Sequence, residues 1–351
     1  MRAGVEIDGS HGEGGGQLVR LAVALSAVTG RPVALRNVRA ARRNPGLAPQ
    51  HLTAVRAVAA LCDAAVDGLE LRSRTLRFAP GALRGGDHRF DVGTAGSITL
   101  ALQALLPVMV AARQRVSVSV VGGTDVRQAP CADYFARVLL PLLARMGIAP
   151  RLDVVRRGYY PRGGGELRLA LDPCAPRPLH LRTRGTLVTI GGHAHVAHLP
   201  EHIATRMRDA ACARLTAVTA VAPSIAAAVL DPSAAQGPGG AIVLWAETTT
   251  TVLGAGRVAE RGVRAETLGA AAGAELAAEL AAAATVDLHA AEQLLVFLAL
   301  AGGGTYLARA LTGHMETAMW LIGQLLPVTF TVEPHGELTR VGVATRPGTA
   351  R

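Results

Sequence analysis

Two stretches that echo each other decide the fold: ALQALLPVMV at residues 101–110 and LIGQLLPVTF at residues 321–330. Each is apolar enough for a buried helix, follows a glycine-containing turn and leads into a strand pattern. The same succession of turn, helix and strand recurs around residues 14–36, 93–121 and 302–332. Recurrence of one such pattern along a chain predicts internal structural repeats, here of an α/β unit.

The first unit can be divided by its periodicity. Leu21, Leu25 and Val28 share one helical face, which predicts a helix over residues 17–29 that Gly30 ends. The further predictions are a strand at 31–38, a helix at 50–62 and a strand-like segment at 68–81.

The second unit has the clearest helix start. Ser97 is a residue type that caps helix N-termini, so a helix is predicted directly after it. Alternating apolar residues then predict a strand within 115–123. A helix over 132–147 and a strand pair around a glycine turn within 151–171 complete the unit.

The texture of the sequence changes between about residues 186 and 284. This part is rich in alanine and contains QGPGG at 236–240 and a threonine run at 248–251. We expect a strand-rich segment with a long helix, inserted between repeats. The expected division is a large domain in two parts at 1–185 and 285–342, an inserted small domain at 186–284 and a loose tail at 343–351.

Length and composition limit the class of protein. The chain has 351 residues, half of them hydrophobic, which suits two domains with a sizeable core. Apolar runs such as 97–111 fall short of the ~20 residues that a membrane span needs. The start of the chain has no signal-peptide pattern, and the four cysteines are scattered without metal-ligand spacing. We therefore expect a cytoplasmic protein with reduced thiols.

The charge balance points to anionic ligands. The net charge is +10, and because the chain contains no lysine, all 36 basic residues are arginine. A basic surplus favours nucleic acid, nucleotides or phosphorylated metabolites as partners. Without lysine, a P-loop, a Schiff base and a lysyl adenylate are all excluded. A covalent intermediate would have to form on another side chain.

Two segments offer candidate phosphate contacts. DGSHGEGGGQ at 8–17 precedes a helix, where glycines allow close backbone approach and N–H groups meet phosphate. Glu13 fits such a site if it holds a divalent cation; an ordinary glycine turn is the alternative. The arginine-rich segment 36–51 matches phosphate geometry but equally suits a solvated face.

HAHVAHLPEH at 193–202 raises the question of a zinc site. His193 and His195 would share a strand face, and His198 and His202 a helix face. The run contains no cysteine or aspartate, and Pro200 interrupts it. An ordinary strand, turn and helix is therefore the favoured interpretation.

His314 lies near the start of an apolar helix, beside Gly313. A lone histidine in such a helix is more often a satisfied core residue. In a lysine-free chain, however, histidine becomes the natural phosphoryl or nucleotidyl acceptor, because neutral imidazole has a free nitrogen that can attack phosphorus.

Six blocks of sequence together resemble the RNA 3′-terminal phosphate cyclase family. They occur in the family's order over about residues 5–342, and RGYYPRGGGEL looks like its signature. The blocks are DGSHGEGGGQLVR, RNPGLAPQHLTAV, GTAGSITLALQALLP, GGTDVRQAPCADYF, RRGYYPRGGGELRL and LTGHMETAMWLIGQLLP.

The resemblance implies an α/β (α+β) fold of three repeats, each a four-stranded sheet with two helices, plus a smaller inserted α/β domain. It implies an enzyme similar to those that convert an RNA 3′-phosphate to a 2′,3′-cyclic phosphate while ATP yields AMP and pyrophosphate. The expected ligands are therefore ATP, Mg²⁺ or Mn²⁺, and RNA with a 3′-phosphate end. No membrane partner is expected, and a homodimer is one option for the assembly.

The same resemblance assigns roles to residues. His314 would become adenylylated, and Glu13 matches the acidic metal-site position. The nucleotide pocket would be lined by Gln103, Pro130, His289, Ala290, Ala291, Glu292 and Gln293. The phosphates of ATP and of the RNA end would be held by Arg20, Arg39, Arg42, Gln50 and His51.

The chain also departs from the family pattern. The family often shows Ser-x-His-x-x-Thr-Asn, whereas here Thr312 replaces the serine and Ala318 replaces the asparagine. Glu316 adds a negative charge near the nucleophile, and His289 stands where the pocket often has tyrosine. These changes affect rate and nucleotide preference more than reaction class.

Three other classes compete with this interpretation. One is a bare nucleotide-binding module, which would not need the group of Arg39, Arg42, Gln50 and His51. Non-catalytic RNA-binding homologues that act in ribosome assembly lack the nucleophilic histidine, so His314 with Glu13 and Arg20 favours an enzyme. Enolpyruvyl transferases use similar repeats, but their sites resemble lysine-and-arginine cages, and this chain has no lysine.

Overall fold

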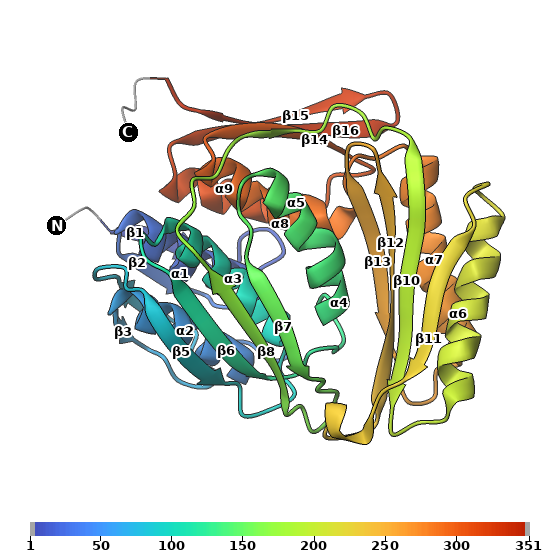
Figure 1. Cartoon of the computed structure of the whole chain (residues 1–351). Coiled ribbons are helices and arrows are strands. Elements are labelled where there is room, and N and C mark those ends of the chain that lie inside the picture. The colour runs from blue at the N-terminus through green and yellow to red at the C-terminus, as the bar shows by residue number, and fades with distance from the viewer. Residues whose placement is uncertain (1–3, 348–351) are drawn as a thin grey trace.

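The computed structural model describes residues 4–347, which contain four mixed four-stranded sheets together with helices (Figure 1). Three of them share one topology, in which the first two strands are parallel neighbours and the other pairs are antiparallel. Their strand orders are β1-β2-β4-β3, β5-β6-β8-β7 and β9-β14-β16-β15. The predicted fold class, three sheet-and-helix repeats with an additional α/β part, is confirmed.

The first unit contains both of its predicted helices. Only the end of the strand-like segment 68–81 is a strand, because Gly68 and Arg72 adopt left-handed backbone angles (φ +75° and +66°) that turn the chain. The elements are β1 (Val5–Asp8), α1 (Gly16–Thr29), β2 (Val33–Arg36), α2 (Pro49–Cys62), β3 (Ala65–Asp67) and β4 (Leu76–Ala79).

The second unit begins its helix where the sequence predicts. The Ser97 side chain accepts a hydrogen bond from the Leu100 N–H at 3.1 Å. The predicted helix 132–147 forms, but with a π-helical turn at Phe135–Leu139 between two α-helical pieces. The elements are β5 (Gly86–Asp91), α3 (Ile98–Ala111), β6 (Val116–Gly122), α4 (Ala132–Tyr134), α5 (Leu140–Arg145), β7 (Arg151–Arg156) and β8 (Gly165–Leu171).

The third unit is split along the chain. Its first strand, β9, pairs in parallel with β14, which lies more than a hundred residues later. The insert occupies the interval between them. The last strand continues to Thr345, beyond the expected boundary at 342. The elements are β9 (Leu179–His180), α8 (Leu288–Leu300), β14 (Gly303–Ala308), α9 (Gly313–Leu325), β15 (Val328–His335) and β16 (Leu338–Thr345).

The insert has a sheet and a hydrophobic cluster of its own. It carries two long helices instead of the one expected, and they pack closely: a Cβ added at Gly269 of α7 would lie 2.0 Å from the Met207 carbonyl of α6. The elements are β10 (Leu187–Ala197), α6 (Glu201–Thr216), β11 (Pro223–Val229), β12 (Gly239–Thr248), β13 (Val252–Val258) and α7 (Ala265–Ala281), in the sheet order β11-β10-β12-β13.

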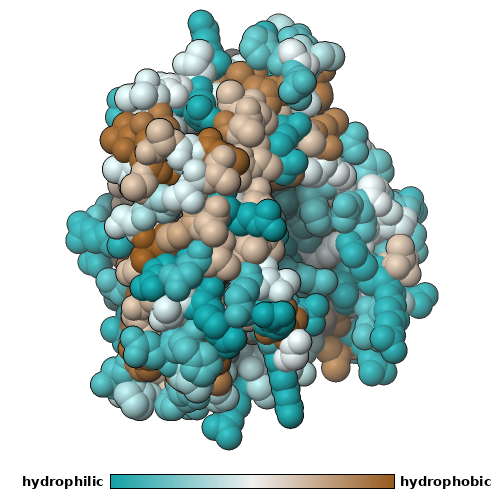
Figure 2. Space-filling view, turned by 90° about the vertical axis from the view of Figure 1, so that its right-hand side faces the viewer, coloured by the Kyte–Doolittle hydropathy of each residue, from teal (hydrophilic) through white to brown (hydrophobic). Residues whose placement is uncertain are grey.

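Helices of the three repeats pack on one another in the interior, with their sheets outside (Figure 1). Helix α1 contacts α2, α3 and α9, and α8 contacts α9. On the insert side of the molecule, hydrophobic residues form scattered groups and hydrophilic residues surround a hollow (Figure 2). Within residues 4–347, the helices are too short or too polar to cross a membrane.

Candidate active site

A cavity of about 660 Å³ lies where the N-terminal ends of several helices meet. First-turn residues from four helices line it: Gly16 in α1, Gln50 in α2, His289 in α8 and His314 in α9. Helix N-termini present free N–H groups and partial positive charge. The shared location of four such ends makes this cavity suited to a polyanion.

The cavity collects all but two of the residues proposed from sequence. Those that line it are Glu13, Arg20, Arg39, Arg42, Gln50, His51, Gln103, Pro130, His289, Glu292, Gln293 and His314. Ala290 and Ala291 are instead fully buried in the core. The reason is helical periodicity: residues 289, 292 and 293 share one face of α8, and the two alanines between them face away.

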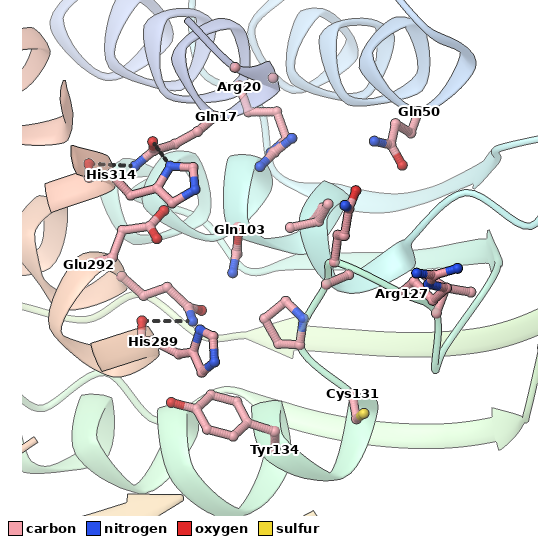
Figure 3. Close-up of a pocket in the computed structure, with 18 of the residues that line it drawn as sticks. Gln17, Arg20, Gln50, Gln103, Arg127, Cys131, Tyr134, His289, Glu292 and His314 are labelled. Carbon is pink, nitrogen blue, oxygen red and sulfur yellow. Dashed lines mark hydrogen bonds between the residues drawn. The ribbon is translucent and has the colours of Figure 1, made fainter. Parts of the chain in front are cut away.

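His314 is held in one orientation by Gln17 (Figure 3). The Gln17 Nε2 donates to the His314 backbone carbonyl at 3.1 Å, which fixes the amide, since a carbonyl can only accept. The Gln17 Oε1 then lies 3.1 Å from the His314 Nδ1, so that nitrogen carries the proton. The Nε2 of His314 is left with its lone pair on the cavity side.

The glycine-rich segment before α1 fits tightly against the start of α9. The Glu13 N–H donates to the Thr317 hydroxyl at 3.2 Å. Glycine is needed at Gly12, where φ is +57° and a Cβ would lie 2.2 Å from that hydroxyl, and at Gly313, where a Cβ would lie 3.0 Å from a Glu13 carboxylate oxygen. This fit brings the Glu13 Oε2 to 3.5 Å from the His314 Nε2.

Arg20 and Glu292 face the cavity beside the histidine (Figure 3). Burial lowers the pKa of Arg20 to about 10, and the nearby Glu292 offsets only part of this effect. Burial likewise raises the pKa of Glu292, against the attraction of His314 and Arg20. The two groups lie beyond ion-pair distance of each other, and each is a desolvated charge beside open space.

Further arginines lie along the cavity wall. The Arg39 guanidinium donates to the Gly46 carbonyl at 2.8 Å, and burial together with Arg42 lowers its pKa. Arg42 contacts the Glu13 carboxylate at 3.3 Å. Among residues 4–347, these contacts leave most guanidinium donors of Arg39 without a protein acceptor.

His51 provides a neutral donor next to these cations. Its Nδ1 accepts the Ala48 N–H at 3.0 Å, so the proton lies on Nε2. Burial is the main cause that lowers its pKa to about 3, with Arg20 and Arg39 adding to it. The Nε2 points past Gly16, where a Cβ would lie 2.0 Å from it.

The other end of the cavity is lined by planar side chains. The His289 ring lies edge-on to Tyr134, with centroids 6.0 Å apart. Its Nε2 lies 3.2 Å from a Glu275 oxygen, and this hydrogen bond is the main cause that raises the pKa of His289. Gln293 donates to the His289 carbonyl at 3.1 Å. Planar side chains of this kind suit a purine base.

Several cavity residues were not foreseen from sequence. Gln17 and Tyr134 lie inside sequence blocks that were singled out, but nothing in the spacing predicts that they face the cavity. Arg127, in the loop between β6 and α4, also lines the cavity. It forms an ion pair at 3.2 Å with Glu260, which follows β13 of the insert. Such pairs join distant segments and leave no local pattern in the sequence.

The histidine run at 193–202 takes two different conformations. His193 and His195 lie on one face of β10, as predicted. The prediction that His198 and His202 share a helix face is wrong, because α6 begins only at Glu201. His198 adopts a left-handed turn conformation (φ +50°), and its Nε2 lies 2.9 Å from the Ala235 carbonyl.

The chain matches known proteins along almost its whole length. The family model described as RNA 3′-terminal phosphate cyclase matches residues 11–332. A protein of that name from Nitrosospira multiformis is 51% identical over 96% of this chain and 95% of its own, and one from Pyrococcus furiosus is 42% identical over 93% and 94%. An enolpyruvyl transferase structure from Streptomyces tendae aligns at 16% identity over 48% of this chain and 33% of its own, with a TM-score of only 0.26. On the family model and these identities, the chain belongs to the RNA 3′-terminal phosphate cyclase family.

Proposed function

We propose that this protein uses ATP to convert an RNA 3′-phosphate end into a 2′,3′-cyclic phosphate through a covalent adenylate on His314. The observation that carries the proposal is the hydrogen bond between Gln17 and the His314 Nδ1, which leaves Nε2 free toward the cavity. A nucleophilic imidazole needs its attacking nitrogen unprotonated, and here the tautomer is set before any ligand binds.

The first step would join His314 to AMP. The Nε2 lone pair attacks the α-phosphorus of ATP, the bond to the bridging oxygen breaks, and pyrophosphate leaves with that electron pair. The new P–N bond places positive charge on the imidazole, and the Gln17 Oε1 stabilises this charge by accepting the hydrogen bond from Nδ1–H. Such bonds are labile, which suits an intermediate in group transfer.

The second and third steps would use the RNA end. An oxygen of the RNA 3′-phosphate attacks the adenylyl phosphorus, the P–N bond breaks, and His314 regains its lone pair. The ribose 2′-OH then attacks the RNA phosphorus, loses its proton to solvent and expels AMP. The product is a 2′,3′-cyclic phosphate, so one ATP yields AMP and pyrophosphate.

Electrostatics would be the main contribution of the cavity. Two polyanions must approach each other, and the four helix N-termini with Arg20, Arg39 and Arg42 offset their repulsion. His51 adds a neutral N–H donor, and Gln50 an amide. The Tyr134 and His289 end, with Pro130, Gln103 and Gln293, offers planar side chains that suit the adenine base.

Glu13 is the residue that would hold Mg²⁺ or Mn²⁺. Mg²⁺ keeps several waters and takes one or two carboxylates together with substrate phosphates, so a single carboxylate beside a phosphate site is a donor set that fits. When bound, the metal would neutralise charge on the triphosphate. The Glu13 carboxylate is held in place by Arg42 at 3.3 Å and lies 3.5 Å from the His314 Nε2, so a cation bound to it would lie close to the attacking nitrogen.

Gln17 is a positioning residue that would compensate for alanine at position 318, where the family often has asparagine. Ala318 is buried and lines a small cleft together with Gln17. Gln17 reaches both the ring and the backbone of His314, so the nucleophile stays oriented without a side chain from residue 318.

The direct test is covalent labelling. The protein is incubated with α-labelled ATP and Mg²⁺, denatured and assayed for retained label; we expect an acid-labile, alkali-stable adduct that is lost in His314→Ala. The matched control is His202→Ala, which removes an exposed histidine of helix α6 and should label normally. Adding a 3′-phosphorylated RNA should discharge the label and make the RNA end resistant to phosphatase.

The outcomes separate the two candidate functions. Label that persists in His314→Ala would overturn the proposed intermediate even if cyclisation occurred. No label in the unaltered protein, together with tight binding of RNA, would favour the non-catalytic RNA-binding homologue that acts in ribosome assembly.

The metal role of Glu13 has a separate test. In Glu13→Gln we expect the metal concentration for half-maximal labelling to rise at least about 10-fold, because a charged ligand has become neutral. Glu260→Gln is the control, since that carboxylate lines the cavity but is paired with Arg127. An unchanged metal requirement in Glu13→Gln would refute the assignment.

A further inference from the structure

A second group of ionisable side chains lies outside the cavity, where strand β10 of the insert meets the start of α4. We call it the joint cluster, and its members are Asp125, Asp133, Arg157, His193 and His195. Asp125, Arg157 and His195 are buried, Asp133 and His193 are partly buried, and none of the five lines the cavity. The proposed reaction uses none of these residues, so their grouping needs its own explanation.

Three members present metal-ligating atoms to one point. The His193 Nδ1 lies 3.3 Å and the His195 Nδ1 3.6 Å from the same oxygen, Asp133 Oδ2. All three ligand atoms lie within 4.8 Å of one another. Zinc bonds of about 2.0–2.1 Å in a tetrahedron place ligand atoms about 3.3–3.4 Å apart. The observed spacings to Asp133 are therefore close to those of a zinc site.

His195 supplies an independent indication that something is bound here. Its side chain is fully buried, and neither ring nitrogen has a hydrogen-bond partner among the described residues. Buried polar groups are almost always satisfied, so an unpartnered imidazole that faces a carboxylate and a second imidazole calls for a ligand. A cation that takes the lone pair of one nitrogen meets this need.

The surroundings orient and balance such a site. Arg157 donates to Asp133 Oδ1 at 2.6 Å and to Asp125 Oδ2 at 3.1 Å, which leaves Asp133 Oδ2 for the histidines. Outer hydrogen bonds of this kind fix ligand carboxylates in known metal sites. Two carboxylates also face one guanidinium, so the cluster has one surplus negative charge that favours a cation.

We propose that His193, His195 and Asp133 bind a zinc ion, with water as the fourth ligand. Two imidazoles and one carboxylate select a transition metal such as zinc over Mg²⁺, which prefers oxygen ligands. The site is reachable from solvent, since the His193 and Asp133 side chains are 28% and 15% exposed. The bound ion would connect the insert to α4, whose Tyr134 lines the nucleotide end of the cavity.

The test measures metal binding by the full-length protein. After removal of metals with a chelator, equilibrium dialysis against Zn²⁺ should give one tightly bound ion per chain, and Co²⁺ should give the intense visible bands of tetrahedral coordination. In His193→Ala, the affinity for Zn²⁺ should fall by more than about 100-fold, because a ligand is lost. Zinc should also raise the melting temperature of the unaltered protein but not of this variant.

Two further variants make the outcome decisive. His195→Leu replaces the buried ring by an apolar side chain of similar bulk and should also lose the tight site while remaining folded by circular dichroism. His202→Ala removes an exposed histidine of the same run and should keep it. Absence of tight zinc in the unaltered protein, or tight zinc retained in both His193→Ala and His195→Leu, would overturn the proposal. Equal loss in His202→Ala would do the same, since it would indicate surface histidines.

Discussion

The cavity and the joint cluster both collect charged side chains, but they balance charge in opposite ways. In the joint cluster, Arg157 forms ion pairs with both Asp125 and Asp133. In the cavity, Arg20 and Arg39 have no carboxylate within ion-pair distance among residues 4–347. Charge that the fold pairs internally stabilises the fold, whereas charge left unpaired at an opening marks a place for a ligand.

The pKa values of two buried arginines, Arg157 and Arg20, shift in opposite directions and show the same contrast. The pKa of Arg157 is raised, because the two aspartates outweigh the desolvation of its guanidinium. The pKa of Arg20 is lowered to about 10, because burial outweighs the attraction of Glu292. The same residue type is thus stabilised as a cation in one region and destabilised in the other, and a bound polyphosphate would remove that penalty.

The largest expected effect on stability concerns Arg157. In Arg157→Met, two carboxylates stay buried without their cation, so the free energy of unfolding should fall by about 3–5 kcal/mol. Urea unfolding at pH 7 with a chelator present measures this without contribution from metal. Arg151→Met is the control, since its pair with Asp172 is exposed at 3.6 Å and should contribute about 0–1 kcal/mol. A loss in Arg157→Met no larger than in the control would show that the pairing adds nothing.

Arg20 should give the opposite pattern. In Arg20→Met, the rate of adenylate formation should fall about 10²–10³-fold, because a cation at the developing phosphate charge is lost. The free energy of unfolding should stay the same or rise, since a desolvated cation without an ion-pair partner is removed. Single-turnover labelling and urea unfolding measure the two quantities. A clear loss of stability would contradict the idea that Arg20 is held ready for a ligand.

The smallest expected effect concerns pH and His51. Its folded pKa of about 3 lies below its usual 6.5, so the unfolded chain takes up the proton first as pH falls. This contribution to stability is complete above pH 6.5 and is lost progressively toward pH 3. The loss amounts to about 2 kcal/mol at pH 5. In His51→Gln, which keeps an acceptor for the helix cap, the fall in unfolding free energy between pH 7 and pH 5 should be smaller by that amount. Equal pH dependence in both proteins would mean that His51 takes up a proton as readily in the folded as in the unfolded chain.

Much of the fold was predictable because its signals are local. The helix at 17–29, the helix at 50–62 and the Ser97 cap all follow from periodicity and end signals, and the structure has each of them. The echo between residues 101–110 and 321–330 misled in one respect: the first stretch lies wholly inside α3, whereas the second spans the end of α9 and the start of β15, and the helix equivalent to α3 in the third unit is α8. The split of the third sheet was not predictable, because the two-residue strand β9 has no pattern of its own and pairs only with a strand far along the chain.

The site was predictable where its residues lie in the sequence blocks that resemble the family. The resemblance brought Glu13, Arg20 and His314 forward, and they meet in one cavity. It also brought in Ala290 and Ala291, because a block taken whole ignores which helix face points inward.

What sequence alone could not supply is contact between distant segments. Gln17 reaches His314 across 297 positions. The aspartate that the histidine run lacked comes from Asp133, 60 residues before His193. Both contacts join side chains from different units, so only the folded arrangement reveals them.

The order of the units along the chain has a consequence for synthesis on the ribosome. The glycine-rich segment and the arginines are made first, whereas His314 lies on the last helix, α9, after the insert has interrupted the third sheet. If His314 is the adenylate acceptor, a nascent polypeptide that ends before α9 has phosphate-binding groups but no acceptor. Prematurely terminated products would then be unable to consume ATP, and reactivity would arise only when translation of the body is nearly complete.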